Sequence, residues 1–151
     1  MKKIIFMFAL AAISVLWTGC KNNDEPKNVD FTGITWELVA FVENGKTTPE
    51  PGRGPESDQD YGYYWIRFNQ DGTISGESSS NDLKGTYSID FSKNTFEVLN
   101  VSVATYVMEV GNGEKFLNCL NTITKFSSTD SSLKLYYTAK DYLLFKISVD
   151  E

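Results

Sequence analysis

No histidine occurs in this sequence, and that absence narrows the chemistry open to the chain. Histidine has an ordinary pKa close to neutral pH, which makes it the usual general base and the commonest metal ligand. The serine- and cysteine-hydrolase arrangements that depend on histidine are therefore excluded. We expect the protein not to be an enzyme, and we expect no catalytic residue, no metal site and no cofactor.

Basic side chains are also few, at 14 lysines and arginines against 20 acidic residues. The first 19 residues hold two of these lysines and no acid, so the chain after them carries 12 basic and 20 acidic residues, a formal charge of −8. An acidic chain without a basic cluster is a poor match for a phosphate backbone, so no nucleic-acid partner is expected.

Cysteine occurs only twice, and Cys20 follows a stretch with the layout of a secretory signal peptide. Lys2 and Lys3 make a basic start, the 14 residues from Ile4 to Trp17 are apolar apart from one serine, and small residues then lead to Cys20. A helix needs about 20 apolar residues to cross a bilayer of roughly 30 Å, so this stretch is too short to span one. We predict a signal peptide over residues 1–19.

The cysteine at the predicted cleavage point resembles the lipobox of bacterial lipoproteins, although Trp17 stands where that family usually has an aliphatic residue. The resemblance implies that Cys20 receives a thioether-linked diacylglycerol and that this lipid holds the protein to a membrane. It implies an outer-membrane lipoprotein of the cell envelope, facing the periplasm or the cell surface. Asp24-Glu25 is similar to the acidic export signal of surface lipoproteins in the Bacteroidetes; by composition the two residues fit an ordinary solvated tether equally well.

Residues 21–30 are polar and include a proline, which predicts a flexible tether over residues 20–31 and a single folded domain over residues 32–151. With Cys20 acylated, Cys119 is the one thiol left, so no intrachain disulfide can form. A lone thiol in an exported protein is exposed to oxidation unless it is buried, so we expect Cys119 to be buried.

Alternating apolar residues predict about eight short strands. In the strand after Tyr63, this alternation places Tyr64, Ile66 and Phe68 in the core. In the strand from Thr95 to Tyr106 the apolar phase changes, which predicts a bulge near Leu99-Asn100. The other predicted strands are Ile34 to Val42, with Trp36, Leu38, Ala40 and Val42 on its apolar face, then Thr73 to Glu77, Lys84 to Phe91, Lys125 to Ser128, and two strands around Leu135 and Phe145.

One helix is predicted, over Glu114 to Thr122 after Gly111-Asn112-Gly113. Its apolar side chains recur at helical spacing on one side, and a helix this short is stable only when that side is packed. The residues on this side are Phe116, Leu117, Cys119, Leu120 and Ile123.

The stretch from Lys46 to Asp60 contains three prolines and two glycines and is predicted to be irregular. Irregular loops of more than about 12–15 residues are uncommon in compact domains and are often functional. Aromatic residues follow this loop directly and offer a stacking surface, beside which charged loop residues can make hydrogen bonds. We predict a ligand-binding site for a glycan or a protein at Arg53, Asp58, Asp60, Tyr61, Tyr63 and Trp65; alternatively, these rings cover a sheet face.

The strands and helix suggest a mainly β fold, an antiparallel barrel or closed sheet of about eight strands with one helix near the C-terminus. The order of motifs resembles the META/HslJ-like domain of bacterial envelope lipoproteins, although two cysteines common in that family are absent; a lipocalin-like lipoprotein is the alternative. The resemblance lies in Trp36 and Leu38, Phe68 with Asp71-Gly72, Asn81 to Gly85 with Tyr87, Glu114, Lys115, Phe116 and Leu120, and Leu133, Leu135 and Leu143 to Phe145.

These features predict a lipid-anchored, non-catalytic binding or assembly module. Two alternatives remain. The chain could be a carbohydrate-active enzyme that uses carboxylates, although no spacing among its acids nominates a pair. It could also be a purely structural component of an envelope complex.

Overall fold

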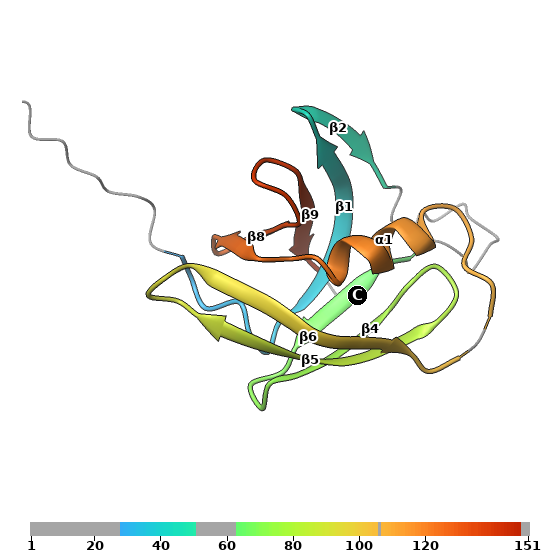
Figure 1. The fold of residues 1–151 in the computed structure, drawn as a ribbon, viewed down its shortest axis with the longest axis horizontal. Helices are drawn as coiled ribbons and strands as arrows, with labels where there is room; N and C mark the ends of the chain where they lie inside the picture. The colour runs from blue at the N-terminus through green and yellow to red at the C-terminus, as the bar shows by residue number, and fades with distance from the viewer. Residues whose placement is uncertain (1–27, 51–62, 106, 149–151) are drawn as a thin grey trace, which may run out of the picture.

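The computed structural model describes residues 28–50, 63–105 and 107–148. These residues form one antiparallel sheet of nine strands and a single helix, and the sheet curls into a closed ring (Figure 1). The barrel-like, mainly β fold with one helix near the C-terminus is thus confirmed. The elements are β1 (Thr35–Glu43), β2 (Lys46–Pro49), β3 (Trp65–Phe68), β4 (Thr73–Glu77), β5 (Asp82–Asp90), β6 (Thr95–Val103), α1 (Gly113–Leu120), β7 (Lys125–Ser128), β8 (Ser132–Tyr136) and β9 (Tyr142–Ile147).

The first and last strands close the ring, because β1 pairs with β9 from Trp36 opposite Ile147 to Val42 opposite Tyr142. The other edge of β1 is shared between two partners. Its residues 35–37 pair with β3, and its residues 40–43 pair with β2. The ring itself therefore runs through β1 and β3 to β9, and β2 lies outside it as the second arm of a hairpin (Figure 1).

Strand β2 occupies the start of a stretch that was predicted to be irregular from Lys46 onward. Asn44 and Gly45 both have positive φ, 51° and 76°, which is the backbone of a two-residue turn that suits the twist of a hairpin. Pro49 is tolerated at the end of β2 because an edge strand does not need every N–H for pairing. The prediction of an irregular segment is therefore wrong for residues 46–49, and residues 51–60 lie outside the described residues.

The inward face of β1 also differs from the prediction. A bulge at Val39 shifts the register against β9, so Leu38 lies opposite Phe145 and Phe41 lies opposite Leu143. Phe41 consequently joins Trp36 and Leu38 in the core, fully buried. Simple alternation was wrong in giving that face to Ala40 and Val42, which are buried but lie outside the main cluster.

Elsewhere the predicted alternation of buried and exposed side chains is confirmed. Tyr64, Ile66 and Phe68 are each at most 2% exposed. The predicted bulge in β6 is present, because Thr86 pairs with Asn100 while Tyr87 pairs with Val98, which leaves Leu99 as the extra residue. The bulge lets the apolar side chains on both sides of Leu99 point into the ring.

Phe31 fills one part of the ring with its aromatic side chain. It is 1% exposed, and its ring centroid lies 5.4 Å from that of Phe68, 5.7 Å from Phe96 and 5.2 Å from Phe126. The side chain of Trp36 donates a hydrogen bond to the Phe31 carbonyl at 2.9 Å. The packed part of the chain therefore begins before residue 32, and Phe31 belongs to the core rather than to a flexible tether.

Helix α1 lies where the ring is weakly joined. Strands β6 and β7 share a single residue pair, Thr95 opposite Lys125, and α1 connects them along the chain beside β6 (Figure 1). The helix buries Phe116, Cys119 and Leu120 on one side, as predicted. Its packing completes the core where strand pairing does not.

Candidate functional site

The predicted aromatic site is only partly covered by the described residues. Arg53, Asp58, Asp60 and Tyr61 lie outside them. Tyr63 and Trp65 flank the buried Tyr64, so both rings face away from the core.

Trp65 lies in a row of paired residues that crosses four strands. Glu37 on β1 and Glu77 on β4 are its two neighbours, and Lys146 on β9 is opposite Glu37. The indole Nε1 of Trp65 donates to Glu77 Oε2 at 3.0 Å, and Lys146 Nζ lies 3.3 Å from Glu37 Oε2. Trp65 is half-buried, and the hydroxyl of Tyr63 lies 3.0 Å from Ser148 Oγ. The row holds the indole in place on the outer face, and the stacking site remains a prediction.

A second group of polar residues, which we call the Glu109 clamp, was not identified from the sequence. It consists of Ser78, Ser79 and Asn81, from the connection between β4 and β5, together with Glu109 from the connection between β6 and α1. Ser78 Oγ and Asn81 Nδ2 each donate to Glu109 Oε1 at 2.6 Å, and Ser79 Oγ donates to Glu109 Oε2. Ser78, Ser79 and Asn81 are each at most 2% exposed.

The clamp also holds the backbone on both sides of Glu109. The side chain of Asn81 accepts a hydrogen bond from the Val107 amide at 2.9 Å and donates to the Val107 carbonyl at 2.8 Å. Ser79 Oγ accepts the Val110 amide at 2.9 Å. Every one of these bonds joins residues 26 to 31 positions apart, so the clamp fixes the 107–110 segment against the end of the ring.

Apolar side chains project from this fixed segment. Met108 is 85% exposed, Val107 56% and Val110 41%. The hydrogen bonds of the clamp thus hold these apolar side chains in contact with water. Because the side chains are exposed, they add no hydrophobic stabilisation to the fold. Fixed, exposed apolar groups are typical of a contact surface for another molecule.

The start of α1 packs directly on the clamp. A Cβ built on Gly113 would clash with Ser79 Oγ and with the side chain of Glu109, so glycine is required at this close approach. The Asn112 side chain donates to Glu50 Oε2 at 2.8 Å, which joins the same connection to the end of the β1–β2 hairpin. The helix and the 107–110 segment are therefore held by one continuous set of contacts.

The carboxylate of Glu109 remains ionised in this environment. Burial raises the pKa of Glu109, but the hydrogen bonds from Ser78, Ser79 and Asn81 together outweigh burial and leave the pKa below its ordinary value of 4.5. Ser79 and Glu109 have the types of a nucleophile and a base, yet Ser79 is 2% exposed and accepts the Val110 amide. The pair therefore serves to hold the chain.

We expect Glu109→Gln to remove part of the stability that the protein loses in acid. Because the folded pKa lies below the unfolded one, the carboxylate stabilises the fold above pH 4.5, and this contribution is lost as the pH falls through the folded pKa. Urea unfolding midpoints measured from about pH 7 to about pH 3 should show a smaller acid decline in Glu109→Gln than in wild type. Glu114→Gln, at an exposed carboxylate on α1, is the matched control, and an identical decline in all three proteins would contradict the assignment.

A third polar group docks the other side of α1 onto the ring. Lys115 Nζ pairs with Glu43 Oε2 at 2.8 Å and lies 4.5 Å from the centroid of Phe41, while Tyr137 donates to Glu43 Oε1 at 3.1 Å.

Burial raises the pKa of the Cys119 thiol to about 11, so at neutral pH the thiol is protonated and weakly nucleophilic. Cys119 is 7% exposed, which confirms the expected burial.

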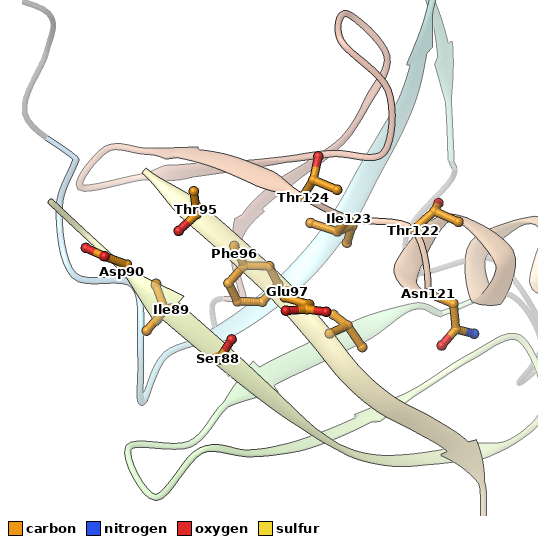
Figure 2. A pocket seen from close by; sticks show the side chains of 11 residues that line it. Ser88, Ile89, Asp90, Thr95, Phe96, Glu97, Asn121, Thr122, Ile123 and Thr124 are labelled. Carbon is orange, nitrogen blue, oxygen red and sulfur yellow. The ribbon is translucent and has the colours of Figure 1, made fainter. Parts of the chain in front are cut away.

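Two grooves lie beside the edge of β6 that faces α1 and β7, and Figure 2 shows the residues that line the first. The first has a volume of about 380 Å³ and is lined by residues 88–90 of β5, residues 95–98 of β6 and residues 121–124. The second has a volume of about 300 Å³ and lies between Val101, Ser102 and Val103 of β6 and Leu117 of α1. Asn121 lines both.

Within the described part of the chain, no three acidic or cysteine side chains gather in a way that could hold a metal ion. No helix in that part is long and apolar enough to cross a membrane.

The Glu109 clamp and the grooves depend on contacts between distant segments, so a local sequence pattern does not reveal them. One signal was available for the clamp. Residues 78–81 are four consecutive small polar residues between two core strands, and Val107 and Met108 are apolar residues next to a lone acid. Together these features indicate a polar connection that has a partner elsewhere in the chain.

Comparison with known proteins shows that the sequence is similar to one protein family and to a protein described as a lipoprotein, and that the fold is similar to solved structures. The sequence model of a family described as a domain of unknown function (DUF4847) matches residues 22–146. A protein of Tannerella forsythia described as "Putative lipoprotein" is 26% identical over 153 residues, covering 97% of both chains.

Two solved structures share the fold. The crystal structure of a DUF4847 family protein from Bacteroides vulgatus is 21% identical, covers 80% of this chain and 96% of its own, and has a TM-score of 0.59. The NMR structure of a protein from Burkholderia xenovorans is 17% identical, covers 99% of this chain and 100% of its own, and has a TM-score of 0.62.

Proposed function

The chain belongs to the DUF4847 family, and we propose that it is a lipid-anchored, non-catalytic module of the cell envelope that binds another envelope protein through its 107–110 segment. The clamped, solvent-exposed apolar residues of this segment are the observation that carries the proposal. An anchor at Cys20 would present the module at a membrane surface.

The clamp supports binding because it lowers the cost of ordering the contact surface. A loop that is already held in one conformation loses less entropy when it binds than a loop that must first become ordered. Asn81, Ser79 and Glu109 hold the segment while Val107, Met108 and Val110 remain exposed. Methionine adapts its unbranched side chain to irregular surfaces, which suits Met108 as the central contact.

The anchor is supported by agreement between this sequence and its relative. The signal-peptide layout ends at Cys20, and the Tannerella forsythia relative described as a lipoprotein aligns over 97% of both chains. Outer-membrane placement, facing the periplasm or the cell surface, is part of the proposal. The observed order of β1, the β3–β4 hairpin, the Asn81 to Tyr87 region and α1 also supports a relation in fold to the META/HslJ-like domain.

A photo-cross-linking amino acid placed at Met108 in the full chain, in intact cells, tests the proposal. We expect a discrete protein adduct from position 108 and about tenfold less from Asn118, an exposed position on α1 that serves as the matched control. Cys20→Ser should release the protein from the membrane fraction and abolish the adduct. Equal adducts from both positions, or none from position 108, would contradict binding through this segment; membrane retention of Cys20→Ser would contradict the anchor.

The row around Trp65 favours a second candidate function, binding of a glycan. A half-buried indole between two carboxylates, Glu37 and Glu77, offers a ring for stacking and acceptors for sugar hydroxyls. Binding to a glycan array that is lost in Trp65→Ala, with an unchanged unfolding midpoint, would support it. Hydrolysis of a bound glycan that one Asp→Asn change abolishes would instead favour the carbohydrate-active enzyme.

A further inference from the structure

Strand β6 has an open edge in the described part of the chain. Along its whole length it pairs with β5, from Val103 opposite Leu83 to Thr95 opposite Asp90. Its other edge pairs with β7 only at Thr95, and one further hydrogen bond runs from the Phe96 amide to the Thr124 carbonyl at 3.3 Å. Beyond Phe96 two grooves lie where a neighbouring strand would be, and Figure 2 shows the residues that line the first of them.

The pattern of hydrogen bonds shows which backbone groups face this open edge. Backbone groups of successive residues in a strand point to opposite sides, and the Phe96 amide points away from β5. The backbone N–H and C=O of Val98, two residues further along, therefore also point away from β5. After the bulge at Leu99, the Ala104 amide donates to the Asp82 carbonyl of β5 at 2.8 Å. Because the direction alternates from residue to residue, the backbone groups of Val103 and Val101 point to the open edge.

The backbone groups on this open edge lie beside the two grooves. Val98 lines the first groove, and Val101 and Val103 line the second, so the open N–H and C=O groups follow the grooves from one end to the other. Apolar side chains of Ile123 and Leu117 stand on the far side. A strand edge that faces a groove with a helix opposite it is the arrangement that accepts an extended peptide by strand addition.

We propose that the edge of β6 binds an extended peptide segment that carries basic side chains, as an added strand between β6 and α1. The lining contains two acidic residues, Asp90 and Glu97, and no lysine or arginine. Asp90 is already paired with Lys93 at 2.8 Å, whereas the side chain of Glu97 is exposed on β6. The backbone groups provide affinity for any extended segment, and Glu97 provides the preference for a basic one.

This inference goes beyond the proposed function, because it concerns a different surface and does not depend on the lipid anchor or on Met108. Failure of cross-linking at Met108 would not contradict peptide binding at β6. Failure of peptide binding at β6 would not contradict a contact through residues 107–110.

Amide hydrogen exchange on the full chain in detergent micelles tests the proposal. The probe is a blocked heptapeptide, Lys-Val-Lys-Val-Lys-Val-Lys, which is basic and has high strand propensity. We expect the amides of Val98, Val101 and Val103 to exchange about tenfold more slowly when the peptide is present, because each becomes a donor to the added strand. The matched control is the same peptide with N-methyl groups on alternate backbone amides, which removes its donors and should remove the protection.

Two further measurements make the proposal specific. The heptapeptide with Glu in place of Lys should bind about tenfold more weakly to wild type, and Glu97→Lys should reverse the order of the two peptides. Val101→Pro should reduce peptide binding while preserving pairing with β5, because it removes an N–H that faces the open edge. A circular dichroism spectrum identical to wild type confirms that the variant folds.

The following results would overturn the proposal. One is equal protection by the N-methylated peptide. Another is absence of protection at millimolar peptide. Slow exchange of the three amides in the free protein would show that the edge is closed by the chain itself. Protection that rises with protein concentration without peptide would show that the edge binds a second copy instead.

Discussion

Truncation of Phe31 to alanine is expected to lower the free energy of unfolding by about 4 kcal/mol, near the upper end for the loss of a buried aromatic ring. Three buried rings, those of Phe68, Phe96 and Phe126, surround it within 5.7 Å and would border the resulting cavity. These rings belong to three different strands, so the cavity cannot be filled by the shift of one element. Urea unfolding, followed by tryptophan fluorescence, measures the change.

Phe91 provides the matched control. Its ring also contacts Phe31 and Phe126, at 6.0 Å and 5.4 Å, but its side chain is 37% exposed. Phe91→Ala should cost about 1 kcal/mol, because less apolar area is lost and no closed cavity forms. Equal losses in the two variants would show that Phe31 does not fill the ring in solution. A chain that begins at Thr32 should be at least as unstable as Phe31→Ala, because it also loses the Phe31 carbonyl that accepts from Trp36, whereas one that begins at Asn28 should not.

The framework of this fold was predictable because alternation of side chains is a local signal. Tyr64, Ile66 and Phe68 are separated by residues that face outward, and the strand has one turn signal at its end, so only one face could be buried. The bulge in β6 could be predicted for the same reason, since Phe96 and Val98 are out of phase with Val101.

The first strand could not be assigned in this way because it is apolar on both faces. Val39 and Phe41 compete with Ala40 and Val42 for the inward positions, and the outcome depends on the pairing of β1 with β9. That partner lies about a hundred positions away in sequence and is equally apolar at Leu143 and Leu144. The phase is decided by tertiary packing, which periodicity in one strand does not contain.

Phe31 and the Glu109 clamp were missed for a related reason. Phe31 stands alone among polar residues, so no periodicity marks it, and only the closed ring provides its neighbours. Ser78, Asn81 and Glu109 are ordinary surface residue types, and the burial of Ser78 and Asn81 follows from the meeting of two connections. Of the predicted site residues, Tyr63 and Trp65 lie on the outer face, a position that alternation with the buried Tyr64 is enough to give.

Replacement of Asn81 with leucine, which has nearly the same shape, is expected to lower the free energy of unfolding by about 3 kcal/mol. The Val107 amide, the Val107 carbonyl and one oxygen of Glu109 all lose a hydrogen-bond partner at a partly buried position, beside the fully buried Asn81 side chain. Asn118→Ala, at an exposed position on α1, is the control and should change stability by less than about 0.5 kcal/mol. The Val107 amide should also exchange faster with solvent in Asn81→Leu, because the segment is no longer held.

Asn81→Asp separates loss of the clamp from loss of packing. Aspartate has the shape of asparagine and can still accept the Val107 amide, but it places a second carboxylate where Asn81 Nδ2 now lies 2.6 Å from Glu109 Oε1. Like charges at this distance repel, so Asn81→Asp should be destabilised most at neutral pH and should recover part of its stability in acid, where one of the two carboxylates is protonated. Asn81→Leu has no added charge and should show no such recovery. If both variants lose the same stability at every pH, the side chain at position 81 does not lie beside the Glu109 carboxylate in solution, and the 107–110 segment is held by other contacts.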